Sequence, residues 1–322
     1  MTTYIIARQW VGNESTAQSL EEGIERLVDF NDIVAQRKDN ITVGIKLTVT
    51  PPYHQHQAVG NTRALLKENG NILEFYDPQD RGAGTSLAQI LFNSSFWGEK
   101  ALVASLDLDQ YIPRDEREYE KTINFIQSVG TDNSLMGIGS RSREVRLSTD
   151  DEANQLRIIH ELINAIAAGK DIYKVETNRA NPRPSGITPG YAQLGETTPG
   201  FYVVNTQHPQ FPKLVANITL HAPHLTGFAM DYYLALKVPQ LGKITTGYVP
   251  THSNDFPPSD QQAQRQRAQN IIKTQTAALS HTDIRRQLAH ALNNPATRKT
   301  VIQFYETGQV DRVLAWMKES MK

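Results

Sequence analysis

Hydrophobic and polar positions alternate along the first half of the chain in a way that predicts strands separated by helices. Runs of β-branched and aliphatic residues predict buried strands at 4–7, 41–50, 72–76 and 100–107. Apolar residues three and four positions apart predict helices over 15–36, 62–67 and 85–96. Strands that alternate with helices of this length are typical of βαβ units. The pattern therefore predicts an α/β fold with a mainly parallel central sheet flanked by helices.

The second half of the chain continues this pattern and then changes character. Further strands are expected at 134–139, 214–220 and 243–250, and helices at 152–169 and 227–238. Residues 176–212 are rich in Pro, Gly, Thr and Asn and predict a long binding loop or lid. Beyond Pro258 the sequence is polar and helical. We therefore expect an α/β domain over 1–255 and a helical C-terminal extension over 256–322, which offers a surface for self-association.

Composition narrows the class of protein. The 322 residues include 33 basic and 34 acidic ones, so the chain lacks the positive field that general nucleic-acid binding requires. The absence of cysteine excludes disulfides and thiolate metal sites. The N-terminus has no signal-peptide pattern, and no run of about 18 apolar residues predicts a membrane span. The expected location is cytoplasmic.

Asp107 and Asp109, at the end of an apolar run, are the strongest candidates for chemistry. If the strand continues through both, their side chains project together from its carboxyl end, because alternate strand residues share a face. In open α/β sheets that end borders the ligand crevice. Paired carboxylates there suit Mg²⁺ or Mn²⁺ that also carries phosphate oxygens. The alternative is a polar strand-to-turn boundary that binds no metal.

A second motif, Arg81-Gly82-Ala83-Gly84, opens the predicted helix at 85–96. Glycines allow a tight turn, and the free N–H groups of a first helical turn can bind an anion. The alternative is a turn with no ligand, since Gly-x-Gly often only separates two elements.

The order of these motifs resembles that of the GT-A nucleotide-diphospho-sugar glycosyltransferases, in particular enzymes related to dolichyl-phosphate mannosyltransferases and glucosyl-3-phosphoglycerate synthases. That family has Asn-Glu after the first strand, Gly-x-Gly, Asp-x-Asp, an arginine after Gly-Ser, an acidic helix and a final strand leading to histidine. The matching residues are Asn13-Glu14, Gly82-Ala83-Gly84, Asp107-Leu108-Asp109, Gly139-Ser140-Arg141, Asp231 and His252. The resemblance covers about residues 4–255 and implies a GT-A fold.

The resemblance implies a role for each matching residue. Asp109 would ligate the metal, Asp107 would assist or hold the ribose, and His252 would complete the metal site. Asp231 would deprotonate the acceptor hydroxyl. The nucleotide-sugar would be bound by Arg8, Asn13, Glu14, Arg81, Gly82, Gly84 and Arg141, and the acceptor by Gly195 and Glu196. Two alternatives stay open: a surface histidine at 252, and a helix-dipole role for Asp231.

The function expected from this resemblance is metal-dependent transfer of a sugar from a nucleotide-diphospho-sugar to a small soluble acceptor, phosphorylated or not. Two segments depart from the family: residues 7–14 are longer and lack its proline, and Pro51-Pro52 replaces an aspartate-rich turn that reads the base. The first departure favours an alternative, a non-catalytic nucleotide-sugar-binding or scaffolding protein. A sugar-phosphate nucleotidyltransferase is disfavoured, because only Gly12 stands where that class has a glycine-rich basic loop. The donor base and sugar, the acceptor and the stereochemistry stay open.

Overall fold

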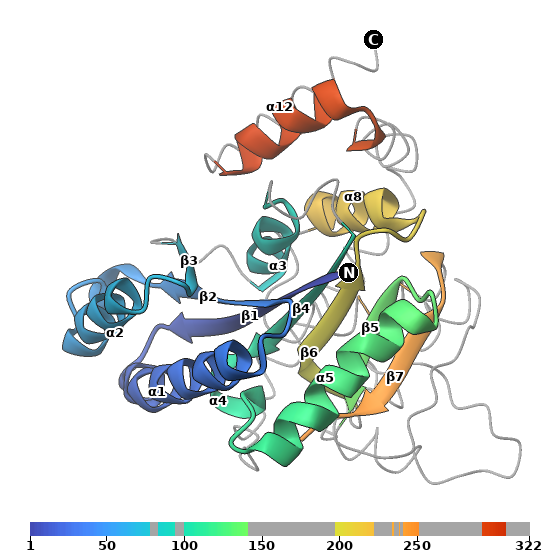
Figure 1. The fold of residues 1–322 in the computed structure, drawn as a ribbon. Helices are drawn as coiled ribbons and strands as arrows, with labels where there is room; N and C mark the ends of the chain where they lie inside the picture. The colour runs from blue at the N-terminus through green and yellow to red at the C-terminus, as the bar shows by residue number, and fades with distance from the viewer. Residues whose placement is uncertain are drawn as a thin grey trace, which may run out of the picture.

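The computed structural model describes residues 1–77, 83–93, 100–140, 197–221, 241–250 and 292–306, together with Leu234 and Val238. In this part of the chain seven strands form one sheet in the order β3-β2-β1-β4-β6-β5-β7 (Figure 1). The strands are β1 (Thr2–Val11), β2 (Ile41–Val49), β3 (Leu73–Asp77), β4 (Ala101–Asp107), β5 (Met136–Ser140), β6 (Thr197–Asn205) and β7 (Ile244–Tyr248).

The sheet is mixed but mainly parallel, which confirms the α/β class predicted from the sequence. β1 is parallel to β2 and β4, β2 is parallel to β3, and β5 is parallel to β7. β6 lies between β4 and β5 and is antiparallel to both. The carboxyl ends of the other six strands therefore share one edge of the sheet, and the amino end of β6 lies at that same edge.

Helices cover both faces of the sheet, as Figure 1 shows. One face carries α1 (Glu14–Arg37), α2 (Gln57–Glu68), α4 (Leu108–Tyr111) and α5 (Glu116–Thr131), with the 3-10 turn η1 (Pro51–Tyr53) before α2. The other face carries α3 (Ala83–Leu91) and α8 (Phe211–His221), with α12 (Pro295–Glu306) beyond them. In α1 the buried residues Leu20, Ile24 and Leu27 are three or four positions apart, which is the spacing of one helical face.

The structure contradicts the long loop predicted over 176–212, because residues 197–205 form the interior strand β6. Phe201, Tyr202, Val203 and Val204 are all buried, and the strand pairs with a neighbour on each side. Pro199 and Gly200 lie at its amino end, where proline and glycine interrupt pairing least. A loop was predicted because these turn residues received more weight than the short apolar run that follows them.

The strand predicted at 214–220 is also wrong, since these residues belong to helix α8. Leu214, Val215 and Ile218 are buried at helical spacing and pack against the sheet with the residues of α3. β-branched residues favour strands only weakly, and burial against a sheet overrides that preference.

Other differences concern the ends of elements. The first strand runs on to Val11, α2 begins at Gln57 instead of 62, and α3 ends at Leu91 instead of 96. Sequence analysis missed α5, although Tyr119, Ile126 and Val129 line one buried side of it. The helix predicted over 152–169 lies outside the described residues.

The C-terminal extension contributes side chains to the same core as the sheet. Leu292, Val301 and Ile302 are buried in one cluster with the apolar residues of α3 and α8. Leu234 and Val238 are helical and fully buried, as the predicted helix 227–238 requires. Across the described ranges, no helix is both long enough and apolar enough to span a bilayer.

Candidate functional site

The sheet order creates a topological switch point between β1 and β4. From β1 the chain moves outward through β2 to β3, and β4 then pairs on the other side of β1. In open α/β sheets, ligands bind in the crevice outside the carboxyl ends of the strands at such a point. The carboxyl ends of β1 and β4 are therefore where this fold is expected to bind a ligand.

Arg8 and Asp107 form an ion pair at that point. They lie directly opposite each other in the parallel β1–β4 pair and so share one face of the sheet. Arg8 Nη2 donates a hydrogen bond of 2.8 Å to Asp107 Oδ1, and the two side chains are 11% and 36% exposed. Asp107 is the last residue of β4, so its carboxylate stands at the edge of the sheet. The fold thus brings together Arg8, which was predicted to bind the nucleotide-sugar, and Asp107, which was predicted to bind the metal.

The Arg8 guanidinium also reaches across β4 to β6. Nη2 donates to the Gly200 carbonyl oxygen at 3.3 Å, and Cζ lies 5.5 Å from the ring centroid of Tyr202. A Cβ atom on Gly200 would lie only 2.3 Å from Asp107 Oδ2, so a side chain there would displace the carboxylate. Sequence reasoning missed Gly200 because it assigned this segment to a loop and not to the strand beside β4.

Two buried polar atoms beside the ion pair make no hydrogen bond with any described residue. They are Arg8 Nε and Ser105 Oγ; Ser105 is 1% exposed and precedes Asp107 by two residues on the same face of β4. Proteins satisfy nearly all of their buried polar atoms, through their own groups or through bound molecules. This donor and this hydroxyl are therefore groups that a polar ligand or an ordered water would satisfy.

Lys46 of β2 is a further charged side chain beside the Arg8–Asp107 pair. It pairs with Arg8 in the β1–β2 register, is buried, and lies 3.8 Å from Asp77 Oδ2. Gln89 of α3 donates to the same Asp77 oxygen at 3.2 Å. Sequence reasoning missed Lys46, although a lysine inside the β-branched run 41–50 was a usable signal, since buried lysines are rare unless paired.

Helix α3 begins beside the end of β2. Ser86 Oγ in its first turn is 3.3 Å from Thr48 Oγ1, and Thr48 is the β2 partner of Trp10. Gly84 is the second residue of the helix, which confirms that the second glycine of the Gly-x-Gly motif lies at a helix start. The N-terminal end of a helix favours anions, because its first N–H groups lack partners within the helix. Cationic side chains and a helix N-terminus thus lie along the same edge.

The expected geometry of the two aspartates is wrong. β4 ends at Asp107, and Asp109 lies in the first turn of the short helix α4. The two side chains therefore do not alternate along one strand. The chain turns into α4 because Leu108 and Tyr111 are drawn into the core, where both are buried.

The residues present fit a divalent cation only if a substrate supplies most of its ligands. Mg²⁺ and Mn²⁺ prefer carboxylate oxygens, and Mg²⁺ commonly takes one or two of them together with phosphates and waters. One Asp107 oxygen is bound to Arg8, and Asp109 stays the metal ligand that the resemblance predicts. Among the described residues, no group of three or more His, Asp or Glu side chains converges on a cation site. Asp107 and Asp109 therefore suit a cation that is bound at the same time by a diphosphate.

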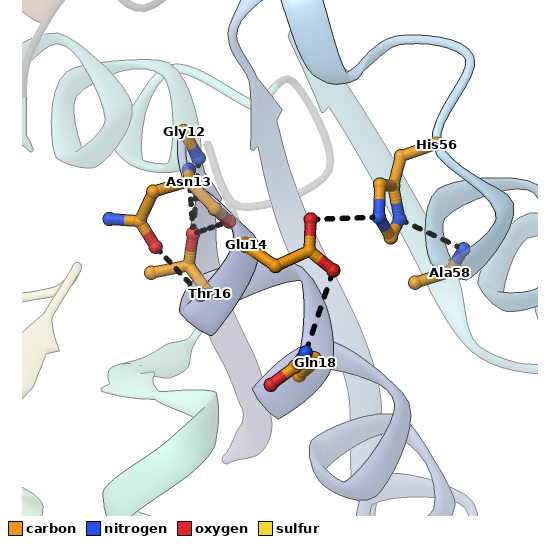
Figure 2. Close-up of polar contacts among 7 residues, drawn as sticks. All are labelled: Gly12, Asn13, Glu14, Thr16, Gln18, His56 and Ala58. Atoms are coloured by element: carbon orange, nitrogen blue, oxygen red, sulfur yellow. Dashed lines mark hydrogen bonds and ion pairs between the residues drawn. The ribbon is translucent and has the colours of Figure 1, made fainter.

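Asn13 and Glu14 form the junction between β1 and α1 (Figure 2). Asn13 is the N-cap of α1: its Oδ1 accepts from Thr16 N at 2.9 Å, while Thr16 Oγ1 accepts from Asn13 N at 3.2 Å. Glu14 Oε2 is 3.5 Å from His56 Nε2, and His56 Nδ1 accepts from Ala58 N at the start of α2. Asn13 and His56 thus cap α1 and α2, and Glu14 contacts the second of these caps. The nucleotide-binding role of Asn13 and Glu14 stays a prediction.

Replacing the cap tests that structural role. Asn13→Ala is expected to lower the free energy of unfolding by about 0.5–2 kcal/mol, because the N–H of Thr16 loses its acceptor. Asn13→Asp keeps the acceptor and should leave stability nearly unchanged. Urea denaturation measures both variants. Unchanged stability in Asn13→Ala would show that the cap contributes little and would leave ligand binding as the role of this residue.

The remaining predicted site residues lie outside the described part of the chain. They are Arg81, Gly82, Arg141, Gly195, Glu196, Asp231 and His252. Their proposed roles in nucleotide-sugar binding, acceptor binding, proton transfer and metal binding therefore stay predictions from the resemblance.

Comparison with known proteins adds no family assignment. No protein-family model matches the chain, and no curated protein matches its sequence.

Proposed function

We propose that this chain is a metal-dependent glycosyltransferase of the GT-A type. It would move a sugar from a nucleotide-diphospho-sugar to a small soluble acceptor, phosphorylated or not. The observation that carries the proposal is the Arg8–Asp107 pair at the switch point of a mainly parallel sheet. A charged pair at this position suits a charged ligand, because the crevice outside β1 and β4 is the binding place of open α/β folds.

The residues around this pair suit a diphosphate. Arg8 offers a guanidinium fork, the side-chain group best matched to phosphate oxygens. The first turn of α3 adds N–H groups at the same edge of the sheet. Lys46 adds a second positive charge next to Arg8 on β2, although its pairing with Asp77 limits this contribution to long-range attraction.

In the proposed reaction the protein holds the donor while the bond between sugar and diphosphate breaks. A bound Mg²⁺ or Mn²⁺ would act as a Lewis acid on the negative charge that develops on the leaving diphosphate. Asp109 would hold this cation, Asp107 would stay oriented by Arg8, and Arg8 would meet the phosphates. Asp231 stays the predicted base for the acceptor hydroxyl, and His252 the predicted third protein ligand of the cation.

A second candidate is a protein that binds nucleotide-sugars without transferring the sugar. It is favoured by the junction after β1, where Asn13 of the Asn13-Glu14 pair shared with the family caps α1 and Glu14 contacts His56. Both candidates predict the same binding, so they differ only in turnover.

Thermal unfolding in the presence of Mn²⁺ and a panel of UDP-, GDP- and ADP-sugars tests the proposal. At a ligand concentration of 100 times Kd, binding to the folded state should add about 2.7 kcal/mol of stability. Removing the cation with EDTA should abolish most of this stabilisation. Release of nucleoside diphosphate supports the transferase, and cation-dependent binding without release supports the second candidate. If no sugar nucleotide stabilises the protein, both candidates are wrong.

A further inference from the structure

Strand β6, which runs between β4 and β5 (Figure 1), leaves its regular pairing where it passes the end of β4. Ile138 of β5 is opposite Tyr202 of β6, whereas Ser140 of β5 is opposite Thr197. Residues 198–201 of β6 therefore face a single residue of β5 and form a bulge. β-Bulges are common beside active sites, where they redirect a side chain or end the pairing of a strand.

Gly200 lies in this bulge, against the carboxylate of Asp107. The pairing between β4 and β6 ends at Leu106 and Phe201, so Asp107 and Gly200 are the next residues beyond the last pair. A Cβ atom on Gly200 would lie 2.3 Å from Asp107 Oδ2 and 2.8 Å from Asp107 Cγ. The carboxylate therefore occupies the space in which any side chain at position 200 would begin.

Glycine is required at this position for space and not for its backbone conformation. The φ angle of Gly200 lies outside the left-handed region that favours glycine. A side chain would instead collide with Asp107 and with the ring of Tyr111, whose Cε2 would lie 2.6 Å from the added Cβ. Glycine weakens a strand, and it often marks a site where another group approaches the backbone closely. At Gly200 the approaching groups are Asp107, at the switch point of the sheet, and Tyr111.

Arg8 holds the other side of the same carboxylate. Its Nη2 donates to Asp107 Oδ1 at 2.8 Å and to the Gly200 carbonyl oxygen at 3.3 Å. One guanidinium nitrogen thus links the end of β4 to the bulge of β6. The carboxylate is bound by Arg8 through Oδ1 and packs on Gly200 through Oδ2, which restricts its rotation.

We propose that Gly200 is a positioning residue, which sets the direction of the Asp107 carboxylate for the cation and the diphosphate by leaving space for it beside β6. This inference rests on the proposed function. Residues that orient the groups of a metal site typically change metal affinity or activity by about 10- to 100-fold when they are replaced. A side chain at position 200 should therefore weaken cation-dependent binding, although Gly200 has no side chain that could contact the ligand.

Calorimetric titration of the full chain with GDP, UDP and ADP at fixed Mn²⁺ tests this inference, with EDTA as the cation-free reference. Gly200→Ala should weaken the cation-dependent binding of the tightest of these three probes by about 10- to 100-fold. In the Asp107→Ala protein the same substitution should have no further effect, because the carboxylate that it displaces is already absent. Gly60→Ala is the matched control: its Cβ would meet no atom within 4 Å, so binding should equal that of the unaltered protein.

The outcomes separate this inference from the proposed function. If the unaltered protein binds none of the three nucleoside diphosphates with Mn²⁺, the proposed function fails and this inference fails with it. If the unaltered protein binds one of them and Gly200→Ala binds it as tightly, the positioning role is wrong and the proposed function stands. The same conclusion holds if Gly200→Ala weakens binding equally in the presence and in the absence of the Asp107 carboxylate.

Thermal unfolding decides the case in which Gly200→Ala does not fold. Asp107→Ala removes one of the two collisions, so the protein that carries both substitutions should fold and unfold cooperatively. If the double variant also fails to fold, the collision with Tyr111 dominates. Gly200 would then be a structural residue only, and the inference would be overturned.

Discussion

Asp109→Asn is expected to lower the release of nucleoside diphosphate from a sugar nucleotide by about 100-fold or more, with the fold unchanged. The substitution keeps the size of the side chain but removes the negative charge that would hold a divalent cation against the leaving diphosphate. Loss of a single group that stabilises developing charge typically costs 100- to 1,000-fold in kcat. Turnover at saturating Mn²⁺, with thermal unfolding as the check on folding, measures the effect.

Asp115→Asn is the matched control. Asp115 also lies at a helix start close to Asp109 in sequence, and its side chain accepts from Glu118 N as the N-cap of α5. Asparagine caps a helix about as well as aspartate, so both stability and turnover should stay near those of the unaltered protein. Equal turnover in Asp109→Asn and Asp115→Asn would show that Asp109 does not hold a catalytic cation.

Phe201→Ala is expected to cost about 3–5 kcal/mol of the free energy of unfolding, the range for removing a buried phenyl ring. Phe201 is fully buried on β6, and its ring centroid lies 5.8 Å from that of Tyr111 and 5.6 Å from that of Phe125. Because β6 borders β4, the resulting cavity would also loosen the strand that ends at Asp107. Urea denaturation followed by circular dichroism measures the loss.

Gln207→Ala provides the comparison on the same segment. Gln207 follows β6 in an exposed turn, so its truncation should change stability by no more than about 0.5 kcal/mol. Similar small values for both variants would indicate that residues 197–205 do not form an interior strand. That result would restore the loop that composition predicts for this segment and remove Gly200 from the site.

The parts of the fold that follow from local pattern could be predicted from the sequence. The first four strands and the helices between them were predicted because each strand is a short apolar run and each helix has a regular buried face, such as Leu20, Ile24 and Leu27 in α1. The Asp107 and Gly84 positions, at a strand end and a helix start, follow from the same signals. The site elements that are marked by local residues at the end of a strand or the start of a helix could therefore be predicted.

The parts that depend on pairing between distant segments could not be predicted. β6 becomes a strand because β4 and β5 lie on both sides of it, information that its Pro-Gly-containing amino end does not carry. Asp109 lies outside the strand because the chain turns after Asp107 into helix α4, which buries Leu108 and Tyr111. The Arg8–Asp107 pair joins residues 99 positions apart, and only the β1–β4 register shows that they are opposite each other.

The central claim is that a nucleoside diphosphate and its divalent cation bind where β1 and β4 end. The most direct test is a crystal structure of the full chain grown with Mn²⁺ and GDP, in which anomalous scattering locates the manganese. We predict one manganese peak bound to the Asp109 carboxylate and to the diphosphate, with phosphate oxygens within hydrogen-bond distance of Arg8. Manganese and nucleotide bound at any other part of the protein would contradict the account.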